Sequence, residues 1–455
     1  MNVARSTPVF LMALLAACGG THDTTVPHEA AASDGSAPAP SLEVWAAEAV
    51  DTDPEVANRA IDALRAAGPA GLAAMLAAHD ADVTRLRGAP ISATREQLEA
   101  LRQDESLQRL RTAIDRIAAQ RDAFASGLYW YTDLAEAQAE ASRSGRPILS
   151  LRLLGRLDEE ASCANSRLFR WMLYPSPAVQ EALAGYVLHW SSERPAPHVT
   201  IDMGDGRTIE RTITGNSVHY VLDASGNVID AITGLHTPDD FVVRLAEAHA
   251  VAEHCGMRFA DRACLRTEHE RLLQATRTAW DLVTALGQPS WDTLVSLDVP
   301  VPAAPSVALA EPLTIGKMAM EMPIVRLLGD APAVAPAPSI AWDVVASIGA
   351  TRGRWSPMPS SSLALARLKT GNVDDAAMLE ASWERARRDT VQNRFTLERR
   401  LHAWLASDVP NDFASLNARV YTELFLTPAS DPWLGLRSDT LWDVMEVSGS
   451  TDGRN

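Results

Sequence analysis

One thiol with a hydroxyl three residues later is the arrangement in this sequence that best suits covalent chemistry: Cys163 precedes Ser166, and Arg167 follows directly. We predict that Cys163 begins a helix, where unpaired backbone N–H groups and the positive end of the helix dipole favour a thiolate. Arg167 and Arg170 would share a helical face with the thiol and add to this effect, whereas the acidic residues 158–160 oppose it. The motif contains no second cysteine, so disulfide exchange cannot be completed within it. The candidate catalytic residues are therefore Cys163, Ser166 and Arg167.

Two further cysteines, Cys255 and Cys264, lie near one another in the sequence. In an oxidising compartment, two of the three cysteines beyond Cys18 are expected to pair, and sequence proximity favours these two. A continuous helix would hold their Cα atoms about 13 Å apart at 1.5 Å per residue, which is beyond the reach of a disulfide. Gly256 offers a break in the chain, so we predict a disulfide, with two buried free thiols as the alternative.

The fourth cysteine, Cys18, ends a short apolar segment. Arg5 precedes an apolar run over residues 8–17, which finishes in Leu15-Ala16-Ala17-Cys18-Gly19. The run is too short to span a bilayer and has a basic N-terminal flank, as export signals do. It resembles a bacterial lipoprotein signal, which implies removal of residues 1–17 and attachment of acyl chains, palmitate among them, through the sulfur of Cys18. An ordinary signal peptide with an incidental cysteine is the alternative.

The composition and net charge of the chain indicate which classes of molecule it can bind. Residues 18–40 are rich in small residues and proline, which predicts a flexible tether. The chain has a formal net charge of −17, which repels phosphate backbones and anionic headgroups. We therefore expect no nucleic-acid partner, contact with a membrane through the N-terminal lipid, and a protein partner. The expected location is the cell envelope, on the periplasmic face or at the cell surface, and no cofactor is predicted.

Three regions follow the tether. Residues 41–126 and 256–455 show helical patterns, the latter interrupted by a Pro-rich stretch at 289–338 that we expect to be extended. In residues 127–255, helices and strands alternate. The predicted order is a helix, a buried strand at 147–154, two helices, a strand, an additional hairpin, a second hairpin and a closing helix.

Helix starts are marked by capping residues. Asp53 before Pro54 indicates an N-cap followed by a proline in the first turn. Asp133 with Glu136 forms a capping-box pattern for a helix that we expect to end at Gly145.

The middle region resembles the thioredoxin superfamily. Residues 137–149 match the pattern A-x-x-x-A-x-x-x-G-[KR]-P-[IV]-L, Cys163 stands where the active-site cysteine begins its helix, and residues 220–226 match the late hairpin. Residues 163–167, 188–190 and 214–217 further resemble uncharacterised bacterial thioredoxin-family proteins with helical flanks. The resemblance implies an α/β thioredoxin-like domain, with a central mixed sheet and flanking helices, between mainly α-helical N- and C-terminal regions.

Two departures from the thioredoxin pattern bear on activity. Ser166 stands where a dithiol enzyme has its resolving cysteine, and Asn216-Ser217 stand where thioredoxins carry the cis-proline that contacts substrate. We therefore favour a degenerate domain that acts as a protein-binding or scaffold module, with Asn216 and Ser217 as the predicted substrate-contact loop. The alternative is a monothiol redox protein in which Cys163 forms mixed disulfides or a sulfenic acid.

Metal binding and hydrolysis receive little support from the sequence. The group of His249, His254, Cys255, Cys264 and His269 lacks a C-x-x-C or H-E-x-x-H core, so we predict ordinary surface histidines and no metal site.

Other polar residues also have ordinary explanations. His189 and His219 lie in predicted strands, where hydrogen-bonded core imidazoles are the expected role. A set of polar residues in the last third could line a pocket, but we favour helix caps and a solvated face for them. These are Asp389, Asn393, His402, Asn417, Tyr421 and Asp431.

Overall fold

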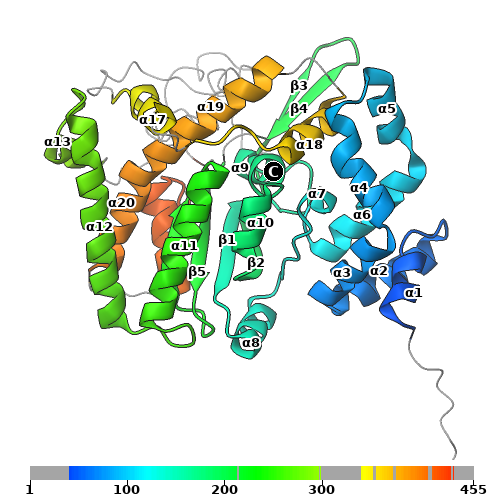
Figure 1. Ribbon diagram of the computed structural model, residues 1–455, viewed down its shortest axis with the longest axis horizontal. Helices are drawn as coiled ribbons and strands as arrows, with labels where there is room; N and C mark the ends of the chain where they lie inside the picture. The colour runs from blue at the N-terminus through cyan, green and yellow to red at the C-terminus, as the bar shows by residue number, and fades with distance from the viewer. Residues whose placement is uncertain are drawn as a thin grey trace, which may run out of the picture. The chain divides into compact units, whose positions relative to one another are not determined.

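The computed structural model in Figure 1 describes residues 40–212, 215–296, 298, 340–351, 355–371, 376–407, 412–431 and 434. The predicted signal at 1–17, Cys18, nearly all of the tether and most of the Pro-rich stretch lie outside the described residues. Among the described helices, none combines the length and apolar character needed to cross a bilayer.

The N-terminal region is helical, as predicted. Asp53 caps α2 by accepting a hydrogen bond from the backbone N–H of Glu55 at 2.9 Å. Gly68, with a φ of +68°, lies between this helix and the next one, which begins at Pro69. The helices are α1 (Leu42–Glu48), α2 (Pro54–Ala66), α3 (Pro69–Ala78), α4 (Asp80–Gly88), α5 (Arg95–Gln103), α6 (Glu105–Ala118) and α7 (Ala123–Ser126).

The middle region contains a mixed sheet with the strand order β2-β1-β5-β6. β1 pairs in parallel with β2 and antiparallel with β5, and β5 pairs antiparallel with β6. The strands β3 and β4 form a separate hairpin. Their bounds are β1 (Ile148–Leu154), β2 (Val187–Arg194), β3 (His198–Asp202), β4 (Thr208–Thr212), β5 (Ser217–Leu222) and β6 (Val228–Thr233).

Four helices of the same region flank the sheet: α8 (Leu134–Ser144), α9 (Ala164–Leu168), α10 (Pro177–Leu183) and α11 (Pro238–Cys255). Asp133 caps α8 through the N–H groups of Ala135 and Glu136, and the helix ends at Gly145 in the left-handed region. A single π-helical turn over Phe169–Leu173 extends α9.

Both faces of the sheet are covered, which explains why β5 and β6 are buried along their whole length. Successive strand residues point to opposite faces. His219 packs against Phe241 of α11, whereas the next residue, Tyr220, packs against Phe413 of the C-terminal region. The C-terminal region therefore supplies part of the core of the sheet.

The C-terminal helices are α12 (Arg262–Thr284), α13 (Trp291–Ser296), α17 (Trp342–Thr351), α18 (Ser360–Thr370), α19 (Ala376–Asn393), α20 (Arg399–Leu405) and α21 (Phe413–Arg419). In Figure 1, α12 and α20 lie side by side, and the two helices are in contact. Further π-helical turns occupy Arg394–Glu398 and Val420–Leu424.

The expectation of extended chain after Pro289 is wrong at α13. Ser290 accepts a hydrogen bond from the N–H of Thr293 at 3.3 Å, and Leu294 is buried in a small core with Trp280. A capped first turn with a buried apolar residue stabilises a helix even in a proline-rich context.

Candidate functional site

Cys163 lies at the N-cap of α9, and its side chain is completely buried. The loop that leads to it from β1 is tight, because the N–H of Cys163 donates to the carbonyl of Leu154 at 3.3 Å. Gly155 has a φ of +72°, and a Cβ placed there would lie 3.2 Å from the Cα of Ser162. The two ends of the loop are therefore held together next to Cys163, whose side chain has no exposed surface.

Asn165 and Ser166 are buried and hydrogen-bonded to residues outside the motif. The hydroxyl of Ser162 donates to that of Ser166 at 2.9 Å. The amide of Asn165 donates to the hydroxyl of Ser217 at 2.5 Å, which joins α9 to the start of β5. Ser166 and Ser217 are therefore held in internal hydrogen bonds at the motif.

The C-terminal region covers the predicted substrate-contact loop. The amide of Asn216 donates to the hydroxyl of Thr427 at 3.0 Å, and the hydroxyl of Tyr421 donates to the carbonyl of Asn216 at 3.3 Å. Arg194 at the end of β2 donates to the carbonyl of Asp431 at 2.6 Å. Asn216 and Ser217 therefore contact this protein's own C-terminal segment, which we call the C-terminal cover (residues 420–431).

Aromatic side chains share the core with Cys163, and Tyr174 is near enough to interact with it electrostatically. The hydroxyl of Tyr174 is hydrogen-bonded to Nε2 of His219 at 2.9 Å, and the ring of Phe169 lies 4.9 Å from that imidazole. Burial lowers the pKa of His219 to about 3, with a further lowering by the nearby His236. Burial, and then the neighbouring Cys163, raise the pKa of Tyr174. His219 is therefore a neutral core imidazole, as predicted, and so is His189, which is hydrogen-bonded to Ser150 at 2.8 Å.

The basic residues on α9 and its π-helical extension have separate environments. Arg170 is buried and donates to the hydroxyl of Ser162 at 3.3 Å, while its guanidinium lies 3.7 Å from the carboxylate of Asp122. Burial raises the pKa of Asp122, but Lys369 and Arg170 outweigh it, so its net pKa is lowered. Arg167 is half-buried. Arg170 is thus part of an ion cluster that ties the N-terminal region, α9 and α18 together.

The predicted cysteine pair is joined in the structure. Cys255 and Cys264 form a disulfide with a Cα–Cα distance of 5.5 Å. The chain reverses at Gly256, whose φ is +113° and where a Cβ would meet the carbonyl oxygen of Phe259 at 2.6 Å. Helix α11 ends at Cys255 and α12 begins at Arg262, so the break in the helix brings the two cysteines together.

A second polar cluster is buried between the sheet and the C-terminal helices. Nε2 of His402 on α20 lies 3.3 Å from the carboxylate of Asp230 on β6. Nε2 of His269 on α12 lies 2.8 Å from the carbonyl of Ile229, and the His269 and His402 ring centroids are 5.3 Å apart. The expectation of a surface histidine is therefore wrong at His269, which α12 places in the core. We call Asp230, His269 and His402 the imidazole cluster.

A neighbouring set of charges lies beside the imidazole cluster. Nδ1 of His236 is 3.0 Å from the carboxylate of Asp240, and its Nε2 is 3.3 Å from that of Glu398. Burial lowers the pKa of His236, but Glu398 and Asp240 outweigh it and the net pKa is raised. Arg244, also on α11, lies 3.9 Å from Asp240. These groups form a buried ion network at the edge strand β6.

The C-terminal polar residues correct one sequence expectation, because they do not form a solvated face. Asn393 donates to the carbonyl of Leu235 at 2.9 Å, and Tyr421 and His402 reach the sheet region as described above. Tertiary contacts with the middle region account for their burial. The sequence signalled this burial only by placing polar residues within the apolar pattern of a helix. The buried members are Asp389, Asn393, His402, Asn417 and Tyr421.

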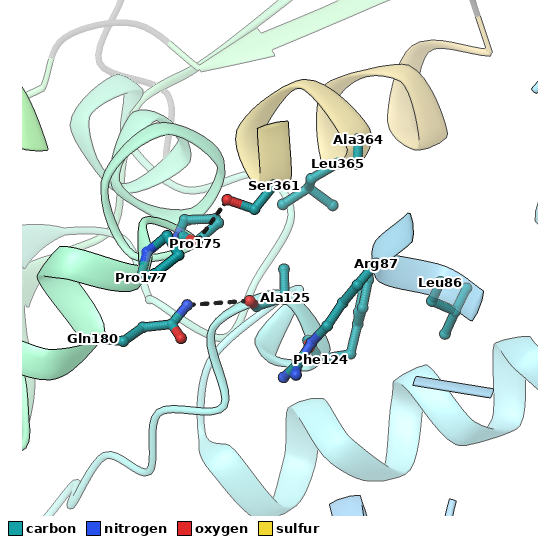
Figure 2. A pocket seen from close by; sticks show the side chains of 10 residues that line it. All are labelled: Leu86, Arg87, Phe124, Ala125, Pro175, Pro177, Gln180, Ser361, Ala364 and Leu365. Atoms are coloured by element: carbon teal, nitrogen blue, oxygen red, sulfur yellow. Dashed lines mark hydrogen bonds between the residues drawn. The ribbon is translucent and has the colours of Figure 1, made fainter. Parts of the chain in front are cut away.

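Two hollows lie near the junctions between regions. The first, in Figure 2, is a cavity of about 180 Å³ between α4, α7, α10 and α18. Gln180 donates to the carbonyl of Ala125 at 3.4 Å and Ser361 to that of Pro175 at 2.7 Å across its walls. It is smaller than the roughly 300–1,000 Å³ typical of small-molecule sites.

The second hollow is an open groove of about 1020 Å³ between α2, α3, α8 and the segment before α8. Its walls include Arg65, Tyr129, Tyr131, Glu140 and Arg146, and we call it the tyrosine groove. Arg65 lies 4.3 Å from the ring centroid of Tyr129 and donates to the carbonyl of Trp130 at 2.7 Å. Arg146 pairs with Glu140 at 3.2 Å. The groove is therefore polar at its rim and carries two half-buried tyrosines.

Comparison of the chain with known protein families, with curated proteins and with solved structures found no match.

Proposed function

We propose that this protein is a lipid-anchored envelope protein whose degenerate thioredoxin-like domain acts as a protein-binding or scaffold module. The observation that carries the proposal is the complete burial of Cys163. A thiol that exchanges disulfides needs access to its partner sulfur, whereas this one is fully buried at a helix start within the core of the sheet.

The thioredoxin-like assignment is supported by topology. A parallel pair β1–β2, with a crossover that begins at Cys163, is followed by the antiparallel hairpin β5–β6 and by α11. This is the order that the sequence resemblance implies, with Cys163 at the helix start after β1.

The loss of redox activity is supported by the covered substrate-contact loop. Asn216 holds Thr427 of the same chain where an oxidoreductase would need an open surface for its substrate. Ser166, in the position of a resolving cysteine, is fully buried in a hydrogen bond with Ser162. On this proposal the domain keeps a thioredoxin-like strand order, while the surface that would carry an active site is part of the core.

The tyrosine groove is the surface best suited to a protein partner. Tyrosine and arginine are enriched in protein interfaces, because they combine a large apolar area with directed hydrogen bonds. Tyr131 lies in this groove, next to Glu140 and Arg146, so a partner would meet both charge signs at the rim.

Thiol accessibility tests the proposal. The full chain in detergent is treated with a maleimide at neutral pH, and Cys163 modification is followed by mass spectrometry, with urea-unfolded protein and Cys163→Ser as controls. We expect labelling of the folded protein to be slower than that of the unfolded protein by more than about 100-fold, because labelling must wait for opening. Rapid labelling, together with a mixed disulfide trapped in cells at Cys163, would instead support the monothiol redox alternative.

Partner binding has a separate test. A photo-crosslinking amino acid at position 131 should capture a defined envelope protein, whereas the same group at the exposed Met203 on the β3–β4 turn should not. Equal capture at both positions would contradict the tyrosine groove as the binding surface.

A further inference from the structure

The imidazole cluster draws its three members from separate elements. Asp230 lies on β6, His269 on α12 and His402 on α20. One ligand-type atom from each lies within 4.8 Å of the others, and the three residues are 5%, 0% and 4% exposed. Three potential metal ligands thus converge at one buried point that the function proposed above does not use.

The histidines present unpartnered nitrogens at this point. Nε2 of His269 lies 2.8 Å from the carbonyl of Ile229, a bond that requires this nitrogen to carry the proton, so Nδ1 holds a lone pair. Among the described residues, Nδ1 of His269 and Nδ1 of His402 have no hydrogen-bond partner. A buried nitrogen without a partner loses its hydration without compensation, and the lone pair on Nδ1 of His269 is available to an electron-pair acceptor such as a metal ion.

The surroundings orient the ligands as metal sites require. A ligating histidine usually donates its other ring N–H to a carbonyl or carboxylate, and His269 donates to Ile229 in this way. The carboxylate of Asp230 is fixed by the N–H of Ala231, which donates to Oδ1 at 2.8 Å.

We propose that Asp230, His269 and His402 bind one divalent transition-metal ion of the Zn²⁺ class. Two imidazoles and one carboxylate suit Zn²⁺ and its neighbours, whereas Ca²⁺ and Mg²⁺ prefer sets of oxygen ligands. Because the ligands come from β6, α12 and α20, the ion would fasten the C-terminal helices to the sheet. Without an ion, the same groups would form only the Asp230–His402 pair, with Nδ1 of His269 unused.

The test uses the full chain in detergent, stripped with a chelator and then supplied with Zn²⁺ alone. Bound zinc is counted by elemental analysis after gel filtration, and the thermal midpoint is measured with and without Zn²⁺. We expect one zinc per chain and a higher midpoint with zinc. His269→Gln and His402→Gln should weaken binding by more than about tenfold. His254→Gln, at an exposed histidine on α11, and Cys163→Ser should bind as the wild type does.

A spectroscopic readout on the wild type covers the case in which the ligand variants do not fold. Co²⁺ in place of Zn²⁺ should give visible ligand-field bands without the near-ultraviolet band of a cobalt–thiolate bond. The proposal is overturned if the wild type retains no stoichiometric zinc and its midpoint does not move. It is also overturned if His254→Gln or Cys163→Ser abolishes binding, or if a thiolate band appears.

Discussion

At the scale of single residues, burial determines what each ionisable group can do. The sequence predicts that Arg170 promotes a thiolate at Cys163. Instead, its guanidinium donates hydrogen bonds within its own loop, to the hydroxyl of Ser162 among others, and pairs with the carboxylate of Asp122. A buried cation stays charged only where carboxylates and acceptors compensate for its lost hydration. The charge of Arg170 thus holds the helix start in place through Ser162 and Asp122.

His189 on β2 should make the stability of the protein depend on pH. Burial, and then Arg152, lower the pKa of His189 to about 4, so between about pH 4 and 6.5 the unfolded chain binds a proton that the folded chain does not. Stability should therefore fall as the pH drops through this window, by up to about 1.4 kcal/mol per pH unit from this residue. Urea unfolding at several pH values should show a shallower dependence for His189→Gln.

A matched variant separates this effect from other titrations. His254 is exposed, so His254→Gln should change the pH dependence of stability less than His189→Gln does. Equal slopes for His189→Gln and the wild type would contradict a neutral His189 in the folded protein.

At the scale of elements, the local pattern predicted most of what lies in the middle region. The apolar run of β1 and the capping aspartates act through neighbours in sequence, so their signals are readable without the fold. The C-terminal cover and the imidazole cluster depend on pairs far apart in sequence, such as Asn216 with Thr427 and Asp230 with His402. No spacing rule reports such pairs, and they decide what the candidate site can do.

The π-helical turns were likewise not predicted from the sequence. They contain or adjoin residues of the sites: Phe169 beside His219, Glu398 beside His236, and Tyr421 above Asn216. A π-helical turn shifts the side chains that follow it and is frequent at functional positions. Helical periodicity alone therefore misplaces side chains beyond these turns.

The C-terminal cover should control how often Cys163 becomes accessible to reagents. Thr427→Val removes the hydroxyl that accepts from Asn216 while keeping the shape of the side chain. A lost hydrogen bond of about 1 kcal/mol corresponds to roughly fivefold more frequent opening, so maleimide labelling of Cys163 should accelerate by about that factor. Thr278→Val, at an exposed threonine on α12 that bonds within its own helix, should leave the rate unchanged. Unchanged labelling in Thr427→Val would mean that the cover does not control access.

At the scale of the whole molecule, the regions are joined through their cores. Leu365 and Leu368 of α18 complete the core of the N-terminal helices, and Tyr421 and Phe425 enter the core of the sheet. A scaffold needs such rigidity, because a surface made by several regions keeps its form only if they do not move independently. Removal of the C-terminal helices should therefore disturb the sheet as well.

The proposed lipid anchor at Cys18 should be detectable by its acyl chains. With a net charge of −17, the protein is repelled by anionic headgroups, so under the proposed lipidation the acyl chains would supply the membrane affinity, and more than one chain would be needed for stable attachment. Labelled palmitate should be incorporated into the wild type and into Cys163→Ser but not into Cys18→Ser, which should leave the membrane fraction or keep residues 1–17. Inhibition of the lipoprotein signal peptidase should cause the longer precursor to accumulate. A mature N-terminus with an unmodified Cys18, or a start elsewhere, would identify an ordinary signal peptide, and the tether would then release the protein rather than hold it.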